Sequence, residues 1–117
     1  ANEASAIFRL RYGQFAMLFL GDAPAAVEQR LVHRAASALR VNALKVAHHG
    51  SADAGLGALL ERASPEAAVI SVGAGNPYGH PAPGTLAELR EHGVEVHRTD
   101  EEGTVRVRVA GDRWAVE

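Results

Sequence analysis

Three short, largely apolar runs, each ending abruptly at glycine or polar side chains, set the strongest constraint on how this chain can fold. They cover residues 15–20, 41–47 and 67–72. Runs of this length are typical of strands that are covered on both faces. Helical patterns fill the stretches between them, so the order is strand, helix, strand, helix, strand. This order predicts an α/β domain with right-handed crossovers and parallel central strands.

Two helices are expected between these strands. The first opens at Pro24, because proline's missing N–H costs nothing in a first helical turn. Its buried stripe recurs at every fourth residue and consists of Val27, Leu31, Ala35 and Leu39. The second helix is short, is marked by leucines within residues 56–60, and ends before Pro65.

Further strands are expected near both ends of the chain. Residues 6–11 alternate between apolar and polar side chains, which predicts a half-exposed strand that forms a hairpin with residues 15–20. After the third apolar run, residues 94–98, 103–110 and 113–116 are expected to close the domain as strands. The turns between them are expected at residues 100–103 and 111–112.

A third helix is expected over residues 85–92. Thr85 and Glu88 have the spacing of a capping box, and Gly93 supplies a C-terminal stop. Before this helix, residues 73–81 form a loop dense in turn residues. The pattern is thus one of strand, polar loop and helix for each of the central strands.

The composition limits the classes of function. A chain of 117 residues suffices for one domain with its own core, and its net charge of −2 argues against nucleic-acid binding by bulk charge while leaving a local basic patch open. Arginine supplies the positive charge except for Lys45. The absence of cysteine excludes disulfides and thiolate metal sites. No run approaches the roughly 20 apolar residues of a membrane helix, and no signal peptide is visible. The start leads straight into a strand, which suggests a piece of a longer protein.

Polar side chains follow each of the three apolar strands. Asp22 follows the first, His48 and His49 follow the second, and Asn76 and His80 follow the third. Ligands of such sheets bind beyond the carboxyl ends of the strands, so these groups are expected to share one rim. An aspartate with two or three histidines is a ligand set suited to Zn²⁺ or Mn²⁺.

Simpler interpretations stand beside this one. Asp22 could cap the helix that opens at Pro24, and the histidine pair could be a strand end without function. Within the metal interpretation, Ser51 and the neighbouring glycine backbone could hold an anion such as a phosphate. Adjacent residues of an extended strand face opposite ways, which disfavours two adjacent histidines as ligands of one metal. The loop before Pro81 could be only a tight connection. The other histidines, His33, His92 and His97, are expected to be solvated surface residues.

Four blocks in order resemble the C-terminal metallo-β-lactamase-fold domain of the ComEC/Rec2 family of DNA-uptake proteins. Asn2 and Ser5 also fit the start of the matching stretch, and the likeness covers nearly the whole chain. The blocks are residues 21–22 (Gly-Asp), 44–51 (Leu-Lys-Val-Ala-His-His-Gly-Ser), 70–73 (Ile-Ser-Val-Gly) with 76–81 (Asn-Pro-Tyr-Gly-His-Pro), and 98–103 (Arg-Thr-Asp-Glu-Glu-Gly).

The resemblance implies a four-layer αβ/βα sandwich that holds one or two metals. The family's histidine- and aspartate-rich block of the first half is absent here, since no His-x-His-x-Asp-His string occurs. Residues 1–117 would therefore be a single domain corresponding to the C-terminal half of the sandwich, with one mixed sheet and flanking helices. Leu20 departs from relatives that carry threonine before the Gly-Asp pair.

The resemblance also implies an activity, the metal-dependent hydrolysis of a phosphodiester in incoming DNA. Asp22, His48 and His49 would be the catalytic and metal-binding residues, with two Zn or Mn ions in the full domain. The resemblance leaves open which histidine binds metal, the other contacting phosphate or acting as a general acid, and whether His80 is a metal ligand or a substrate-binding group. Phosphate would be bound by Ser51, Asn76 and His80. Two alternatives stay open, a non-catalytic module that binds DNA or a partner, and a stand-alone small-molecule metallo-hydrolase. This chain alone is expected to bind metal weakly or not at all and to be inactive.

Partners and location follow from the same resemblance. The expected partners are DNA, the N-terminal half of the same domain and a membrane channel region of the parent protein. An uncovered apolar sheet face would also favour self-association. The chain would be a soluble domain attached to the bacterial cytoplasmic membrane, on its outer, periplasmic or extracellular side.

Overall fold

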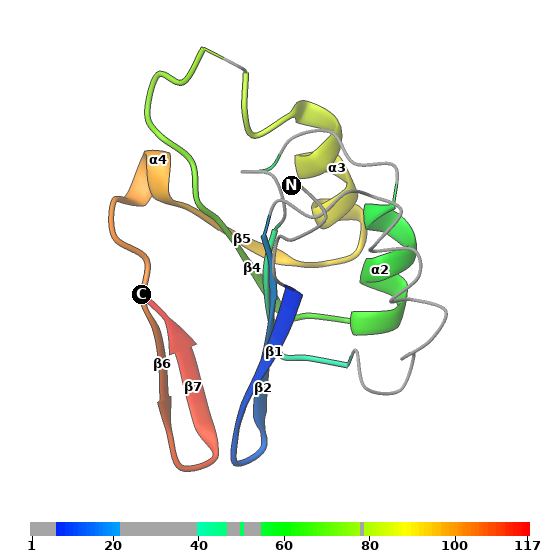
Figure 1. Ribbon diagram of the computed structural model, residues 1–117, viewed down its shortest axis with the longest axis vertical. Helices are drawn as coiled ribbons and strands as arrows, with labels where there is room; N and C mark the ends of the chain where they lie inside the picture. Colours follow the sequence, from blue (N-terminus) through cyan, green and yellow to red (C-terminus); the bar gives the residue numbers. More distant parts are fainter. Residues whose placement is uncertain (1–6, 22–39, 47–49, 51–54, 78) are drawn as a thin grey trace.

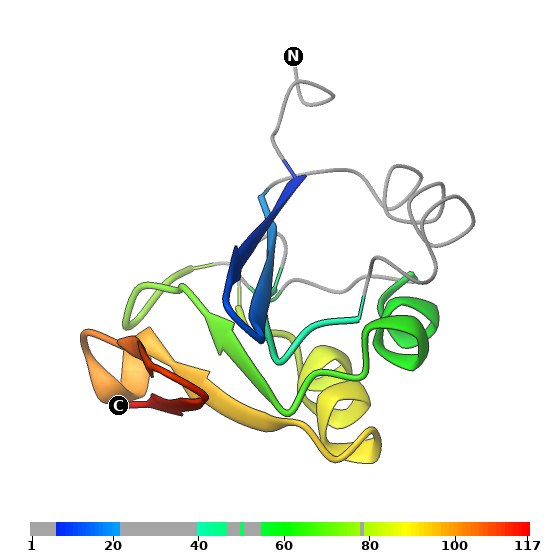
Figure 2. The same ribbon diagram turned by 90° about the horizontal axis from the view of Figure 1, so that it is seen from below.

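The computed structural model describes residues 7–21, 40–46, 50, 55–77 and 79–117. Within them a five-stranded sheet is covered by helices on one face and by a β-hairpin on the other (Figures 1 and 2). The elements are β1 (Ile7–Tyr12), β2 (Phe15–Leu20), β3 (Ala43–Lys45), α2 (Leu56–Ala63), β4 (Ala67–Ile70), α3 (Pro83–Glu91), β5 (Glu95–Arg98), α4 (Thr99–Glu102), β6 (Val107–Ala110) and β7 (Arg113–Val116).

The sheet has the order β1-β2-β3-β4-β5, so neighbours in the sheet are also neighbours in the chain. β1 and β2 form an antiparallel hairpin in which Tyr12 pairs with Phe15. The turn between them contains Gly13, whose φ is +58°. β2, β3, β4 and β5 are parallel to one another. The structure confirms the mixed α/β sheet, the N-terminal hairpin and the parallel central strands.

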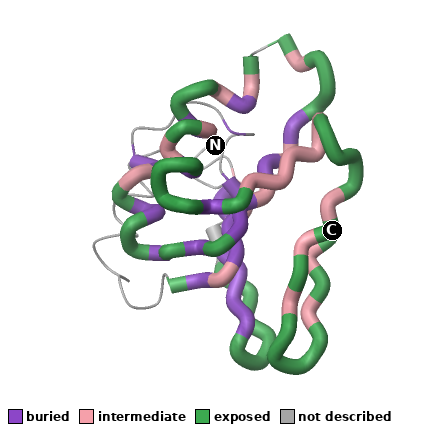
Figure 3. Tube along the Cα trace, turned by 180° about the vertical axis from the view of Figure 1, so that it is seen from behind, coloured by how far each residue is buried: buried purple, intermediate pink, exposed green. Residues whose placement is uncertain are grey.

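The main core lies between the sheet and the helices. Leu18, Leu44 and Ala68 lie side by side across three strands and are buried. α2 places Leu56, Leu59 and Leu60 against them, since residues three and four apart share one face of a helix. Figure 3 shows buried residues concentrated in the central strands, whereas the strands of the β6–β7 hairpin alternate between exposed and intermediate residues.

The second face of the sheet is not left open as the sequence suggested. The β6–β7 hairpin lies on it, and Phe15, Met17 and Ala43 are buried there. The rings of Phe15 and Trp114 pack with centroids 5.3 Å apart and planes tilted by 52°. The apolar surface available for self-association is therefore smaller than expected, because the chain supplies its own cover over part of this face.

Two local predictions about the closing part of the chain are wrong. α3 begins with Ala82 as its N-cap and Pro83 in the first turn, so Thr85 is a buried helical residue rather than the start of a capping box. The expected turn at residues 100–103 is instead the one-turn helix α4, and the strand expected over 103–110 shortens to β6. Gly93 ends α3 as predicted, with φ +71° and its N–H donating to the Arg90 carbonyl.

The second expected helix is confirmed as α2, while β3 and β4 are shorter than their apolar runs. The first expected helix, after Pro24, lies outside the described residues. No helix in the described part of the chain is both long and apolar enough to cross a membrane.

Candidate functional site

The four parallel strands end along one edge of the sheet, as the sequence predicted for the apolar runs. We call this the carboxyl edge. It includes the loop between β4 and α3, which lies at the top of Figure 1, opposite the β1–β2 turn. The described residues that directly follow the four strands are Gly21, Val46, Ser71 and Thr99.

Four of the residues predicted for the site lie outside the described part of the chain. They are Asp22, His48, His49 and Ser51. Their sequence neighbours are described: Gly21 precedes Asp22, and Gly50 stands between His49 and Ser51. Val46 continues the pairing of β3 with β4, because its N–H donates to the Val69 carbonyl over 3.0 Å.

Gly50 brings two of the predicted blocks into contact. It is buried at φ +81°, a conformation that favours glycine. A Cβ at this position would lie 2.7 Å from the Cβ of Pro81 and 3.0 Å from Cγ2 of Ile70. The Gly50 carbonyl also accepts a 2.8 Å hydrogen bond from the Ala82 N–H. Gly50, which follows the two histidines in the sequence, and the His80–Pro81 segment, which has a cis peptide bond, therefore meet at the carboxyl edge.

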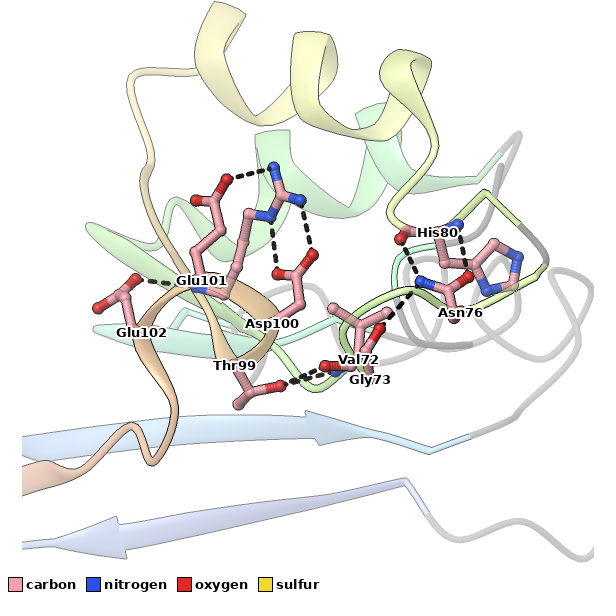
Figure 4. Close-up of polar contacts among 9 residues, drawn as sticks. Val72, Gly73, Asn76, His80, Thr99, Asp100, Glu101 and Glu102 are labelled. Atoms are coloured by element: carbon pink, nitrogen blue, oxygen red, sulfur yellow. Dashed lines mark hydrogen bonds and ion pairs between the residues drawn. The ribbon is translucent and has the colours of Figure 1, made fainter.

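The carboxamide of Asn76 holds the loop before this proline together (Figure 4). Its Nδ2 donates to the carbonyls of His80 at 2.7 Å and Gly73 at 3.2 Å, and its Oδ1 accepts from the His80 N–H at 3.0 Å. Both ends of the carboxamide thus bind backbone. This geometry fixes the backbone of His80, which is half-buried.

Thr99, which directly follows β5, hydrogen-bonds to Val72, which lies between β4 and this loop. The Thr99 hydroxyl accepts a hydrogen bond from the Val72 N–H and donates one to the Val72 carbonyl, each over 2.8 Å. One hydroxyl satisfies two backbone groups because it is both donor and acceptor. The loop is therefore anchored at Val72 and held internally by Asn76, as Figure 4 shows.

An ion-pair cluster beside Thr99 was not predicted as part of the site. Arg98 binds Asp100 through two hydrogen bonds of 3.0 and 2.7 Å and lies 3.2 Å from Glu101. The Arg98 hydrogen bond lowers the pKa of Asp100 below its ordinary value, and the same bond raises the pKa of Arg98. The sequence signals were the polar run of residues 98–103, within which a turn was expected, and the place of this run among the four blocks that carry the family resemblance.

His97 differs from the solvated surface residue expected from the sequence. Its side chain is only 14% exposed. Its Nδ1 lies 3.1 Å from Oε1 of Glu102. Its buried Nε2 has no hydrogen-bond partner among the residues described. The Glu95 carboxylate lies 3.7 Å from this nitrogen, which is within ion-pair distance but too far for a hydrogen bond. Glu102 has a lowered pKa, first because of its hydrogen bond with His97 and then because it accepts the Arg98 N–H. His92 is exposed, as expected.

The described side chains do not by themselves form a metal site, because no group of three or more His, Asp or Glu among them could hold an ion. The expected metal depends on Asp22, His48 and His49. An aspartate and imidazoles are donors that suit Zn²⁺ or Mn²⁺, and the strands that these residues follow end at the carboxyl edge.

Comparison with known proteins finds competence proteins. The chain is 35% identical over 105 residues to competence protein ComA of Neisseria gonorrhoeae, covering 90% of the chain and 15% of that relative. It is 31% identical over 107 residues to ComE operon protein 3 of Bacillus subtilis, covering 92% and 14% respectively. It is 31% identical over 116 residues to recombination protein 2 of Haemophilus influenzae, covering 99% and 14%.

No family model matches the chain, and no solved structure matches it. The chain spans about 15% of the length of the curated relatives it matches. It is homologous to one segment of bacterial competence proteins.

Proposed function

We propose that this chain is part of a metal-dependent phosphodiester hydrolase domain in a DNA-uptake protein of the ComEC/Rec2 family. The observation that carries the proposal is the contact between Gly50 and Pro81 at the carboxyl edge. It joins two blocks that are about 30 residues apart in the sequence, and each block contains histidine. The homology to competence proteins supports DNA as the polymer that is handled.

In this proposal Asp22 and one of His48 and His49 hold a Zn or Mn ion. When bound, such an ion would polarise a phosphoryl oxygen and lower the pKa of water toward about 7. The other histidine contacts phosphate or acts as a general acid. Ser51 and His80 contact phosphate oxygens.

Asn76 acts as a positioning residue here, and this changes its expected role. Its carboxamide binds the backbone of Gly73 and His80, so its contribution to phosphate binding is to hold the backbone of His80 in place. Thr99 and the Arg98–Asp100 pair act one step further away, because Thr99 binds the backbone of Val72 at the base of the same loop.

The remaining parts of the proposal concern the parent protein. We propose a metallo-β-lactamase-like sandwich in which this chain supplies the second half and further metal ligands come from another segment of the parent. The domain would be attached to the bacterial cytoplasmic membrane on its outer side, next to a channel region. Homology to much longer competence proteins supports one part of this arrangement, namely that the parent contains further segments.

A cleavage assay with the full-length protein tests the activity. Asp22→Ala and His49→Ala should each reduce Mn²⁺- or Zn²⁺-dependent plasmid cleavage by about 100-fold or more, since loss of a ligand or a general acid removes about 10²–10⁴-fold of rate. His92→Ala is the matched control, because His92 is exposed at the end of α3 and should leave the rate unchanged.

The outcomes separate the candidate functions. Unchanged cleavage in both variants would reject the carboxyl edge as the active site. Binding of DNA by the wild-type protein without metal-dependent cleavage would instead identify a non-catalytic DNA-binding module. Cleavage of small phosphodiesters but not of DNA would identify a small-molecule hydrolase.

A further inference from the structure

A polar pocket lies at the opposite, amino-terminal edge of the parallel strands. Its volume is about 400 Å³, which falls in the usual range of ligand pockets. β1, the start of β2, and the segments that enter β3 and β4 form its walls. The lining residues are Arg9, Arg11, Gln14, Ala16, Arg40, Val41, Asn42, Ser64 and Glu66.

Arginine dominates the charge of this pocket. Three arginines and one glutamate line it, so its net charge is +2 in a chain whose net charge is −2. No carboxylate among the described residues pairs with any of the three guanidinium groups. Arg9 and Arg11 donate only long hydrogen bonds of 3.4 Å, to the carbonyls of Arg40 and Gly13. Their remaining N–H groups have the forked geometry with which guanidinium groups bind phosphate oxygens.

One wall of the pocket is fixed by hydrogen bonds between backbone groups and by one to the Asn42 side chain. Asn42 and Ala16 bind each other twice, through Ala16 N–H to Asn42 Oδ1 at 2.9 Å and Asn42 N–H to the Ala16 carbonyl at 2.8 Å. The Asn42 carbonyl also accepts the Glu66 N–H at 2.9 Å. Arg9 and Arg11 therefore line the pocket beside a wall that is already ordered, which reduces the entropy cost of binding.

We infer that this pocket binds phosphate groups of a nucleic-acid backbone at a position separate from the carboxyl edge. That the phosphates belong to DNA rests on the proposed function, whereas the anion-binding chemistry rests on the pocket alone. Ala16 in the pocket and Gly21 at the carboxyl edge are five residues apart along one strand, or about 16 Å at 3.3 Å per residue. One bound strand could thus contact the pocket while another of its phosphates lies at the carboxyl edge.

Fluorescence anisotropy of a labelled single-stranded oligodeoxynucleotide tests this inference with the 117-residue chain at several salt concentrations. The pocket variant replaces all three lining arginines, Arg9→Gln, Arg11→Gln and Arg40→Gln. We expect its affinity to fall about tenfold or more, and its salt slope to decrease by about two because each phosphate contact contributes about 0.7 on single strands. Glu66→Gln should tighten binding, because it removes the only carboxylate among the described lining residues.

The matched control carries the same loss of charge on exposed residues outside the pocket, Arg90→Gln, Arg106→Gln and Arg108→Gln. It should retain most of the wild-type affinity. Equal losses in the two triple variants, no loss in the pocket variant, or no binding by the wild-type chain would each overturn the inference. Circular dichroism of every variant separates lost binding from lost folding.

A competition experiment distinguishes phosphate groups of a nucleic acid from free phosphate as the ligand of the pocket. Inorganic phosphate should displace the labelled oligonucleotide only at concentrations at least about 100-fold above those at which the unlabelled oligonucleotide does, because a single phosphate replaces only one of several contacts. Stronger displacement would show that the pocket is a site for free anions, and would overturn the nucleic-acid assignment. The proposed hydrolase fails separately, through unchanged cleavage by Asp22→Ala, so the two failures are distinguishable.

Discussion

The two edges of the central sheet differ in how the chain builds them. The carboxyl edge consists of loops in which side chains bind backbone, as Asn76 and Thr99 do. The amino-terminal edge carries charged side chains on a hairpin strand, and their guanidinium groups have no carboxylate partner within the described residues. Under the two proposals this difference is a division of labour. Loops whose backbone is fixed by side chains are suited to holding reacting groups in place, and cations without a carboxylate partner are suited to retaining a polyanion.

The contact at Gly50 gives the largest expected effect on this comparison. Gly50→Ala places a Cβ 2.7 Å from Pro81 and strains a residue at φ +81°. We expect a loss of about 2–4 kcal/mol in the free energy of unfolding, as the sum of overpacking and left-handed strain. Urea denaturation measures it.

Gly75→Ala is the matched control for that change. Gly75 has φ +69°, but a Cβ added there would meet no atom within 4 Å, so only the backbone cost of about 1 kcal/mol applies. Equal effects at Gly50 and Gly75 would show that the contact with Pro81 contributes nothing to the carboxyl edge.

Asn76 gives the next largest effect. Asn76→Ala removes three side-chain hydrogen bonds to backbone and should lower the free energy of unfolding by about 2 kcal/mol, at about 0.5–1.5 kcal/mol per bond. Asn76→Asp keeps an oxygen that can accept the His80 N–H, but it places a second carboxylate oxygen against the Gly73 and His80 carbonyls, so it should lose at least as much stability as Asn76→Ala. A clearly smaller loss in the aspartate variant would contradict the assignment of Nδ2 as the donor to these two carbonyls.

The Arg98–Asp100 pair gives the smallest expected effect, and it depends on pH. Because the pKa of Asp100 is lowered in the folded state, its stabilising contribution is present above the unfolded pKa of about 3.9 and is lost as the pH falls through the folded value. The difference in urea midpoint between wild type and Asp100→Asn should therefore be present at pH 7 and narrow below about pH 4. When both proteins also carry Arg98→Gln, the difference in urea midpoint should change much less between pH 7 and pH 4. An equally large change would show that a group other than Arg98 causes the pH dependence.

Local signals were sufficient to predict much of the fold. The alternating residues of β1 and the continuous apolar run of β2 identified the hairpin, and Gly93 identified the end of α3. The capping box failed because Pro83, two residues before Thr85, already occupies the first turn of α3. α4 was missed because a helix of one turn has little intrinsic stability and here coincides with the ion pairs of Arg98.

Contacts between segments that are far apart in the sequence could not be predicted from the sequence pattern. Nothing in the pattern of β6 and β7 indicates that they cover Phe15, because packing of one hairpin on another depends on the whole fold. The pocket arginines were visible individually, but Arg9 and Arg40 are 31 residues apart and share a site only once β1 lies beside the entry to β3. The grouping of strand ends at one edge was predictable, because chain order and parallel pairing determine it together.

Steady-state cleavage of an oligonucleotide by the full-length protein tests the division of labour most directly. Asp22→Ala should lower kcat by about 100-fold or more. The triple pocket variant, Arg9→Gln, Arg11→Gln and Arg40→Gln, should raise KM about tenfold and leave kcat nearly unchanged. An unchanged kcat in Asp22→Ala, or a pocket variant that lowers kcat as strongly as Asp22→Ala does, would contradict the account.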